Sequence, residues 1–280
     1  MKFENKFNLP EEFTAIIDAH TRRYDKGKSD YSVTQLIDSP RVVHLREKNK
    51  KKIVADYSDM IAATTGSSFH HILEESNETV KHFIAEKRFF QPVMGIILSG
   101  AADIYNKKTK IIGDYKTCSV WQHGKLKDEW IQQLNILAWL ASREGYKVKG
   151  LKIFKIFKDW KKSMVERSES YPKCQLEVSD VELWDLKDTE EFIKQRINLH
   201  EDVRKGKEYM CTEEDTWYSG DSWAIKKKGG KKAVRILHVE PKEVEEGYEV
   251  EFRKGVHKRC EDYCSVSQFC DQYQNRKSWD

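Results

Sequence analysis

The chain has 280 residues, of which 39% are hydrophobic and 34% are charged, and its formal net charge is +4. These values indicate a globular protein with a real core and exclude a strong overall positive field. Any affinity for nucleic acid must therefore come from local basic stretches. Such stretches occur at residues 46–52, 147–162 and 226–232, although each one taken singly is equally typical of a solvated surface.

The first residues, MKFENKFNLPEEF, lack the apolar segment of a signal peptide. No stretch approaches the roughly 18 apolar residues that a membrane span requires. We therefore expect a cytoplasmic protein without membrane contact. Its six cysteines are then not expected to form structural disulfides, and their spacing is examined for metal or cluster binding. Without a repeat or a clear linker, we expect residues 1–205 and 206–280 to pack as one structural unit.

The first predicted elements are helical. Residues 31–47 read as a capped helix, with Ser32 or Thr34 as the cap and Pro40 closing or restarting the segment. A second helix runs from residue 67, and helical spacing places Phe69, Ile72 and Leu73 on one face. His70 borders that apolar face and His71 lies opposite it. Of the two adjacent histidines, His70 is thus expected to face inward.

A β-hairpin follows in the prediction. The helical pattern is expected to continue over residues 79–89, before strands at 93–98, 100–105 and 110–116 with a turn at 106–110. Asp114 and Lys116 are two residues apart, so in a strand their side chains point to the same face. Burying such charges is expensive without a partner, and a divalent cation would provide one.

The remaining elements alternate between helix and strand. Residues 128–143 form an amphipathic helix whose apolar stripe includes Trp130, Leu134 and Leu137. Gln133 falls on the same side, where it either faces the core or lies at the helix edge in contact with water. The other expected elements are a strand at 148–157, an extended segment at 178–186, a helix at 189–205 capped by Asp188, and a turn at Gly229 and Gly230 before a strand at 233–239.

The residue types of the hairpin suit phosphodiester hydrolysis. Two carboxylates, such as Asp103 and Asp114, can hold a hard cation that binds phosphate oxygens and lowers the pKa of a bound water. A lysine beside the cation, such as Lys116, can orient or deprotonate that water and stabilise developing charge. Taken alone, the pattern is also one that arises by chance in a lysine-rich chain.

Four segments in order resemble a known family: GSSFH at 66–70, SGAAD at 99–103, GDYKT at 113–117 and QLNIL at 133–137. They are similar to the motifs of the PD-(D/E)XK nuclease superfamily, in its RecB-type exonuclease branch, which includes phage-encoded single-domain nucleases and CRISPR adaptation exonucleases. The resemblance implies an α/β fold with a restriction-endonuclease-like core, a mixed central sheet flanked by helices, and a cysteine-bound C-terminal region.

The same resemblance implies roles for individual residues. His70, Asp103, Asp114 and the Tyr115 carbonyl would hold Mg²⁺ or Mn²⁺, and Lys116 would be the catalytic lysine. Gln133 would begin the Gln-x-x-x-Tyr motif of the branch, from which this chain departs because residue 137 is leucine. A glutamate often found ahead of the hairpin corresponds to Glu86, and its role is left open.

The implied function is a metal-dependent deoxyribonuclease, with an exonuclease preferred to an endonuclease. DNA is the expected partner, and recombination or replication proteins are further candidates. Two alternatives remain: a DNA-binding or assembly protein with weak or accessory activity, and a resolvase of branched DNA. Strand preference, polarity of digestion and oligomeric state are not determined at this point.

Three clustered cysteines predict a second site. Cys260, Cys264 and Cys270 lie within eleven residues, in a tail whose low apolar content favours stabilisation by a bound metal. Cys211 is the preferred fourth ligand, with Cys118 and Cys174 as alternatives. Spacing does not separate zinc from an iron-sulfur cluster. The resemblance implies a 4Fe-4S cluster on one distant and three C-terminal cysteines, although in that branch the distant cysteine often precedes the nuclease core.

Overall fold

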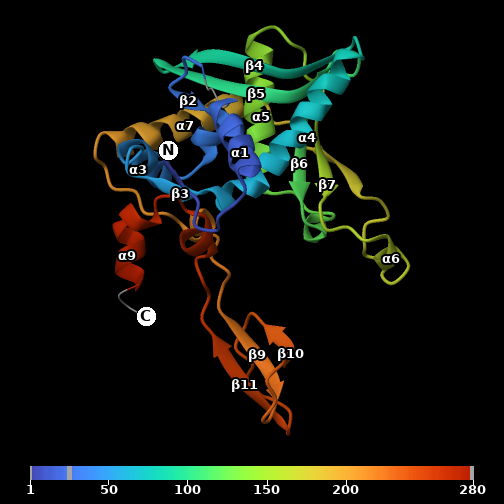
Figure 1. Ribbon diagram of the computed structural model, residues 1–280, viewed down its shortest axis with the longest axis vertical. Helices are drawn as coiled ribbons and strands as arrows, with labels where there is room; N and C mark the ends of the chain where they lie inside the picture. The colour runs from blue at the N-terminus through green and yellow to red at the C-terminus, as the bar shows by residue number, and fades with distance from the viewer. Residues whose placement is uncertain (1, 24–26, 278–280) are drawn as a thin grey trace. The chain divides into compact units, whose positions relative to one another are not determined.

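The computed structural model describes residues 2–23 and 27–277 of the chain, which forms two compact units (Figure 1). Met1–Asp38 and Val54–Gly206 make up the first, here called the sheet unit. Ser39–Ile53 and Lys207–Asp280 make up the second, here called the cysteine unit. The short segment Ser39–Ile53 therefore belongs to the same compact unit as the residues that follow Gly206.

The sheet unit is built on a six-stranded mixed sheet with the order β2-β5-β6-β7-β8, in which β4 pairs with β5. Strands β6 and β7 are parallel and are joined through helix α5, and β2 is parallel to β5. The pairs β4–β5, β5–β6 and β7–β8 are antiparallel. The elements of this unit are β1 (Lys2–Glu4), α1 (Glu11–Arg23), β2 (Tyr31–Ser32), α2 (Val33–Ile37), β3 (Val54–Asp56), a 3-10 helix (Tyr57–Met60), α4 (Ile61–Glu78), β4 (Phe83–Val93), β5 (Ile96–Asn106), β6 (Ile111–Cys118), a 3-10 helix (Val120–Gln122), α5 (Asp128–Arg143), β7 (Gly150–Phe157), α6 (Lys162–Val165), β8 (Leu176–Val181) and α7 (Leu186–Arg204). The expected mixed central sheet with flanking helices is confirmed.

Helix α5 packs on the sheet with the face that the sequence predicts. It spans Asp128–Arg143, and Trp130, Leu134 and Leu137 are all buried. The approach is close at Gly100, where a Cβ atom would lie 2.6 Å from Leu137 Cδ2 and 2.6 Å from Val33 Cγ2. Glycine at this position of β5 therefore allows α5 and α2 to pack directly against the strand that carries Asp103.

Two predicted elements differ from the structure. Residues 79–89 were expected to be helical, but β4 occupies Phe83–Val93 and pairs with β5 along nearly its whole length. Hydrogen bonds to the next strand in the chain, β5, here override a weak local helical preference. Helix α7 begins at Leu186 rather than Thr189, and its cap is Asp185, whose side chain accepts a hydrogen bond from the Lys187 amide. The expected cap, Asp188, lies in the first turn instead.

The N-terminal helical prediction and the hairpin agree with the structure. Ser32 is the cap of α2 and forms a capping box with Gln35, and Pro40 restarts the chain as a new helix. Residues 107–110 turn between β5 and β6, and the Lys110 amide donates to the Asn106 carbonyl at 2.8 Å. Of the two predicted strands, residues 96–98 and 100–105 belong to a single strand, β5, whereas Val93 ends β4 and residues 94–95 form the turn between them.

The cysteine unit contains a three-stranded antiparallel sheet of order β10-β9-β11. Gly229, with φ of +74°, lies in the turn between β9 and β10 as expected. A small core of Val42, Ile53 and Val266 holds the remaining segments together. The elements are α3 (Pro40–Lys48), α8 (Glu213–Thr216), β9 (Ser222–Lys227), β10 (Ala233–Leu237), β11 (Tyr248–Arg253), a π-helix (Arg259–Tyr263), a 3-10 helix (Ser267–Phe269) and α9 (Asp271–Lys277).

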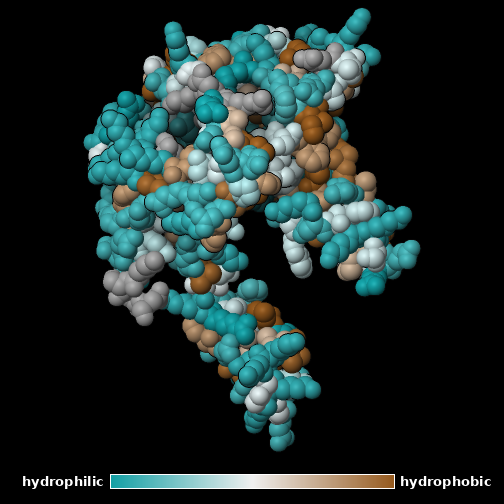
Figure 2. All heavy atoms as spheres, in the orientation of Figure 1, coloured by the Kyte–Doolittle hydropathy of each residue, from teal (hydrophilic) through white to brown (hydrophobic). Residues whose placement is uncertain are grey.

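The surface seen in Figure 2 is hydrophilic over most of its area, with hydrophobic side chains in small groups. Among the helices of residues 2–23 and 27–277, none combines the length and the apolar character that crossing a bilayer requires.

Candidate functional site

The two aspartates of the hairpin lie where β5 and β6 separate. The ladder between these strands ends at Ile104 and Gly113, and the next free amide, that of Tyr115, donates to Asp103 Oδ2 at 2.7 Å. The Asp103 carboxylate thus accepts the bond that a backbone carbonyl would accept in a longer ladder. The side chains of Asp103 and Asp114 are only 11% and 2% exposed, so both carboxylates lie in a largely dry environment.

His70 and Glu86 face Asp103 from two other elements. His70 Nδ1 on α4 lies 3.6 Å from Asp103 Oδ2 and 3.5 Å from Glu86 Oε1 on β4. One ligand atom from each of the three residues lies within 4.8 Å of the other two. His70, Glu86 and Asp103 therefore form a compact group of metal-ligating side chains, and Glu86 is the member whose role the sequence left open.

Glu86 reaches this position through an irregular backbone. The register of β4 against β5 passes from Ala85 to Lys87 and omits Glu86, whose φ is +49°. A non-glycine residue in the left-handed region carries strain and is frequent where a functional side chain has to be aimed. This irregularity is not visible in the sequence, where AEKRF reads as part of a regular element.

Lys116, Asp114 and Gln133 form a closed set of polar contacts. Lys116 Nζ lies 2.7 Å from Asp114 Oδ2 and donates to Gln133 Oε1 at 3.1 Å, while Gln133 Nε2 donates to Asp114 Oδ1 at 3.1 Å. The amide of Gln133 thus connects the lysine and the carboxylate from helix α5. Asp114 Oδ2 is buried, and the Lys116 ammonium at 2.7 Å is its charged neighbour, although the angle between them is not that of a hydrogen bond.

The site is electrostatically strained without a cation. Burial, together with the neighbouring Asp114 charge, raises the pKa of Asp103 to about 7. The pKa of His70 is also raised, chiefly by its hydrogen bond to Glu86. Carboxylates brought this close repel one another unless a positive charge lies between them. Two or three carboxylates and one imidazole are a donor set that suits Mg²⁺ or Mn²⁺, so the residues present fit such an ion.

The two adjacent histidines of α4 have different surroundings. His71 is exposed and faces Glu74 and Glu75 on its own helix, at 3.7 Å and 3.4 Å. His70 faces the aspartates, as its helical position predicts. The reason differs from the one inferred from the sequence, because Phe69 and Ile72 of the supposed apolar face are 42% and 62% exposed. His70 is held by polar partners on the sheet.

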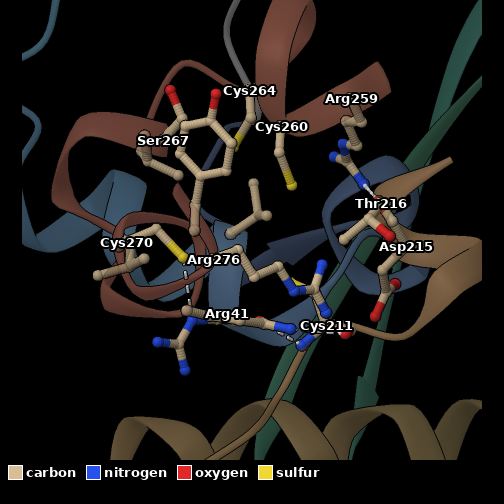
Figure 3. Close-up of a pocket in the computed structure, with 15 residues that line it drawn as sticks. Arg41, Cys211, Asp215, Thr216, Arg259, Cys260, Cys264, Ser267, Cys270 and Arg276 are labelled. Carbon is tan, nitrogen blue, oxygen red and sulfur yellow. Dashed lines mark hydrogen bonds between the residues drawn. The ribbon is translucent and has the colours of Figure 1, made fainter. Parts of the chain in front are cut away.

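The cysteine unit brings four thiols to one cavity (Figure 3). Cys211, Cys260, Cys264 and Cys270 all line a cavity of about 20 Å³, whereas Cys118 and Cys174 belong to the sheet unit. Figure 3 labels the four cysteines together with three arginines of the cavity wall, Arg41, Arg259 and Arg276.

Buried thiols of this cavity do not ionise easily by themselves, so they suit binding of a positively charged group better than reactions of a free thiolate. Burial raises the pKa of Cys211 to about 11 and raises those of Cys260 and Cys264 as well. Arg41 Nε donates to Cys270 Sγ at 3.3 Å, and the Ser39 hydroxyl lies 3.2 Å from Cys211 Sγ. Four sulfur donors in one enclosed cavity fit a thiolate-bound metal group, whose binding would displace the thiol protons.

No protein-family model matches the sequence, and no curated protein matches it. Among solved structures, the chain is similar to SSO0001, with a TM-score of 0.49 and 20% identity over 67% of this chain and 84% of that chain. It is also similar to an alkaline exonuclease (LHK-Exo) from Laribacter hongkongensis, with a TM-score of 0.33 and 14% identity over 48% of this chain and 66% of that chain.

A third similar structure is a phage related exonuclease from Haemophilus somnus 129PT, with a TM-score of 0.31 and 11% identity over 71% of this chain and 85% of that chain. All three TM-scores lie below 0.5. What this chain does therefore has to be inferred from its own side chains.

Proposed function

We propose that this protein is a metal-dependent deoxyribonuclease of the PD-(D/E)XK type that hydrolyses phosphodiester bonds, acting as an exonuclease. The observation that carries the proposal is the position of His70, Glu86 and Asp103, within 4.8 Å of one another and next to the Asp114–Lys116 pair. A buried group of carboxylates with a lysine at 2.7 Å is costly to fold and needs a chemical purpose.

The ligand roles follow from position. Asp103, Asp114 and His70 would hold the cation, together with the Tyr115 carbonyl, and Glu86 adds a fourth side chain that sequence reasoning left unassigned. Mg²⁺ or Mn²⁺ bound there would supply a water of lowered pKa and would neutralise charge on the scissile phosphate. The same ligands keep the phosphate and the water on one side of the hairpin.

Lys116 and Gln133 provide the remaining chemistry. The Lys116 ammonium would orient the attacking water and stabilise the negative charge that develops on phosphate oxygens. Gln133, bonded to both Lys116 and Asp114, would hold these two side chains in one geometry. Leu137 stands where the resembled motif has tyrosine and is 1% exposed, so we assign the contribution of α5 to Gln133.

A matched pair of histidine variants tests the assignment. We expect wild-type protein with Mg²⁺ or Mn²⁺ to degrade end-labelled linear DNA, and His70→Ala to lose this activity. The control is His71→Ala on the same helix, which should keep it because His71 contacts only neighbouring glutamates of α4 among the described residues. Equal activity of the two variants would refute the ligand role of His70.

Lys116→Ala separates the nuclease from the alternatives. It should abolish cleavage while leaving the circular dichroism spectrum and Mn²⁺ binding intact. If wild-type protein binds DNA but does not cleave it in the presence of any divalent cation, a binding or assembly role replaces the nuclease. Preferential cleavage of a four-way junction over linear duplex would instead favour a resolvase, and release of single nucleotides from one labelled end distinguishes an exonuclease from an endonuclease.

For the second site, we propose a structural 4Fe-4S cluster on Cys211, Cys260, Cys264 and Cys270. Two observations support it: the four cysteines share one cavity, and three arginines of its wall would offset the negative charge of a thiolate-bound cluster. Protein purified without oxygen should be brown and contain iron and acid-labile sulfide in equal amounts. Colourless protein with one zinc per chain would overturn this choice.

A further inference from the structure

An exposed tryptophan stands just beyond the strand that carries Asp114 and Lys116. Trp121 is 78% exposed, the largest value among the exposed large hydrophobic side chains of the described residues. It lies in the 3-10 helix Val120–Gln122, five residues after Lys116. Chain geometry keeps the two residues within about 18 Å of each other. Single exposed hydrophobic residues are ordinary. Trp121 differs in that the backbone on both of its sides is anchored by hydrogen bonds.

The backbone around Trp121 is anchored at its N-terminal side by Asp159. The Ser119 hydroxyl donates to Asp159 Oδ2 at 2.6 Å, and the Val120 amide donates to Asp159 Oδ1 at 2.8 Å. Ser119 also caps the short helix by accepting a bond from the Trp121 amide at 3.4 Å. These contacts hold the two residues before Trp121, Ser119 through its side chain and Val120 through its amide.

The C-terminal side is anchored by a buried ion pair. Lys155 on β7 is fully buried, and its Nζ donates to the Gln122 carbonyl at 3.1 Å and to Glu177 Oε1 at 2.6 Å. Glu177 also contacts the His123 ring and accepts from the Gly124 amide at 3.3 Å. Burial alone would raise the pKa of Glu177, but hydrogen bonds from Lys155, His123 and Ser179 lower it to about 2.

The loop 119–124 is therefore pre-organised. A buried lysine-carboxylate pair is costly to desolvate, and here its hydrogen bonds hold the C-terminal side of the loop at Gln122, His123 and Gly124. An exposed aromatic ring on a rigid backbone loses little conformational entropy when a ligand covers it. A loop that only contacts water needs neither a fixed backbone nor an exposed aromatic ring, whereas residues 119–124 have both.

Exposed basic side chains follow strand β7, whose C-terminal end contacts the same loop through Lys158 and Asp159. Lys158, Lys161 and Lys162 follow strand β7 and are exposed, and Asp159 among them is the anchor of the Trp121 loop. Strands β6 and β7 are parallel, and the Lys158 amide donates to the Cys118 carbonyl at 2.9 Å, so the segments after both strands leave the sheet at the same edge. An aromatic ring flanked by lysines is the pattern of single-stranded nucleic-acid recognition.

We propose that Trp121 is a stacking platform for a base of single-stranded DNA, with Lys158, Lys161 and Lys162 contacting the backbone of the same strand. The proposal rests on the proposed nuclease function and names its substrate form: a strand end separated from its complement, led past Trp121 to the site at Asp103 and Asp114. Stacking on an exposed ring does not depend on base identity, so this contact would add affinity without sequence preference.

The test is equilibrium binding of full-length protein to a fluorescent single-stranded oligodeoxynucleotide in EDTA, where no cleavage occurs. Trp121→Ala should raise Kd roughly five- to a hundredfold, and Trp121→Phe should restore most of the affinity. An oligonucleotide of abasic sites should bind wild-type protein more weakly than the normal strand does. The Kd of this abasic strand should be the same for Trp121→Ala as for wild-type protein. The control is Phe7→Ala, which removes another exposed aromatic side chain and should leave Kd unchanged.

Three outcomes would overturn the platform: unchanged Kd for Trp121→Ala, equal losses for the normal and abasic strands in that variant, or failure of Trp121→Phe to recover affinity. A ring that serves a protein contact would give the first of these. Because binding is measured without metal, the result is independent of hydrolysis. Strand binding through Trp121 without cleavage under any cation would refute the proposed function alone, whereas cleavage with unchanged Kd would refute the platform alone.

Discussion

Glu86 belongs to the candidate metal site, although its neighbours in sequence give no sign of this. Its left-handed backbone removes it from the β4 ladder and turns the carboxylate toward His70, 3.5 Å away. A regular strand residue there would leave the histidine with Asp103 as its acidic partner. The strain of the backbone is therefore best understood as the condition for a fourth side-chain ligand.

We predict that Glu86→Gln weakens Mn²⁺ binding, measured by calorimetry, because the substitution removes charge while keeping shape. The loss should be at least as large as the roughly 10- to 100-fold effect of removing an outer-shell partner of a metal site. Glu75→Gln on α4 is the control and should bind Mn²⁺ as wild type does. Unaltered affinity in Glu86→Gln would leave the carboxylate without a metal role.

His200 on helix α7 gives a pH-dependent prediction. It is 3% exposed, its Nε2 lies 3.0 Å from the Leu36 carbonyl, and burial lowers its pKa to about 4. Between the ordinary pKa near 6.5 and this value, the unfolded chain binds the proton and the folded chain does not. Stability should therefore fall as the pH is lowered through this window.

The expected contribution of His200 is a loss of about 2 kcal/mol in unfolding free energy between pH 7 and pH 5. Urea titrations at the two pH values measure it, with His200→Gln as the comparison. The variant should be less stable at pH 7 but should show a smaller decrease on acidification. An identical decrease in both proteins would show that other groups cause it.

At the scale of elements, strand β7 carries two lysines with contrasting surroundings. Lys152 and Lys155 each lie 2.6 Å from a carboxylate of β8, Asp180 and Glu177 respectively. The Lys152 pair is open to solvent, with Asp180 84% exposed, whereas Lys155 is fully buried. The same pairing across the same two strands therefore occurs in water and in the protein interior.

We predict that Lys155→Ala lowers the unfolding free energy by about 3 kcal/mol, the lower end of the range for breaking a buried ion pair. Glu177 loses its buried lysine but keeps its contacts with His123, Ser179 and the Gly124 amide. Lys152→Ala should change the unfolding free energy by less than about 1 kcal/mol, since exposed pairs contribute little. Denaturant unfolding of both variants provides the measurement. Adding Glu177→Gln to Lys155→Ala should recover part of the loss, and no recovery would argue against the uncompensated carboxylate charge as its cause.

At the scale of the whole molecule, the two candidate sites belong to different compact units. The carboxylate site lies in the sheet unit and the four thiols lie in the cysteine unit. The core of the cysteine unit around the thiols is small, with three buried hydrophobic residues and partly buried neighbours that include Cys211 and Cys264. If the proposed cluster is bound there, we expect it to supply much of the stability of this unit.

We predict that Cys260→Ser, or removal of the cluster by a chelator under oxidising conditions, makes residues 207–277 sensitive to protease while residues 54–206 stay resistant. Mass spectrometry of the fragments locates the cleavage sites. Mn²⁺ binding at the carboxylate site should persist. Cys174→Ser, at an exposed cysteine of the sheet unit, is the control, and equal proteolysis of both variants would contradict a structural role of the cluster.

The sequence alone determined the features that depend on local pattern. The amphipathic period of residues 128–143 predicts helix α5 with its observed bounds, and Ser32 is one of the two caps predicted for the N-terminal helix. The turn at 106–110 between two strands predicts the hairpin of Asp103 and Asp114. The preference for His70 over His71 was also available, because helical geometry separates adjacent residues by about 100°.

Tertiary structure decided what depends on distant partners. Strand β4 exists in place of a predicted helix because β5 supplies its hydrogen bonds, and that pairing brings Glu86 to His70. Packing also joins Cys211 to the C-terminal thiols and sets Cys118 and Cys174 apart, a choice that spacing leaves open. Local periodicity acts over a few residues, whereas the position of a ligand is set by contacts between segments far apart in the chain.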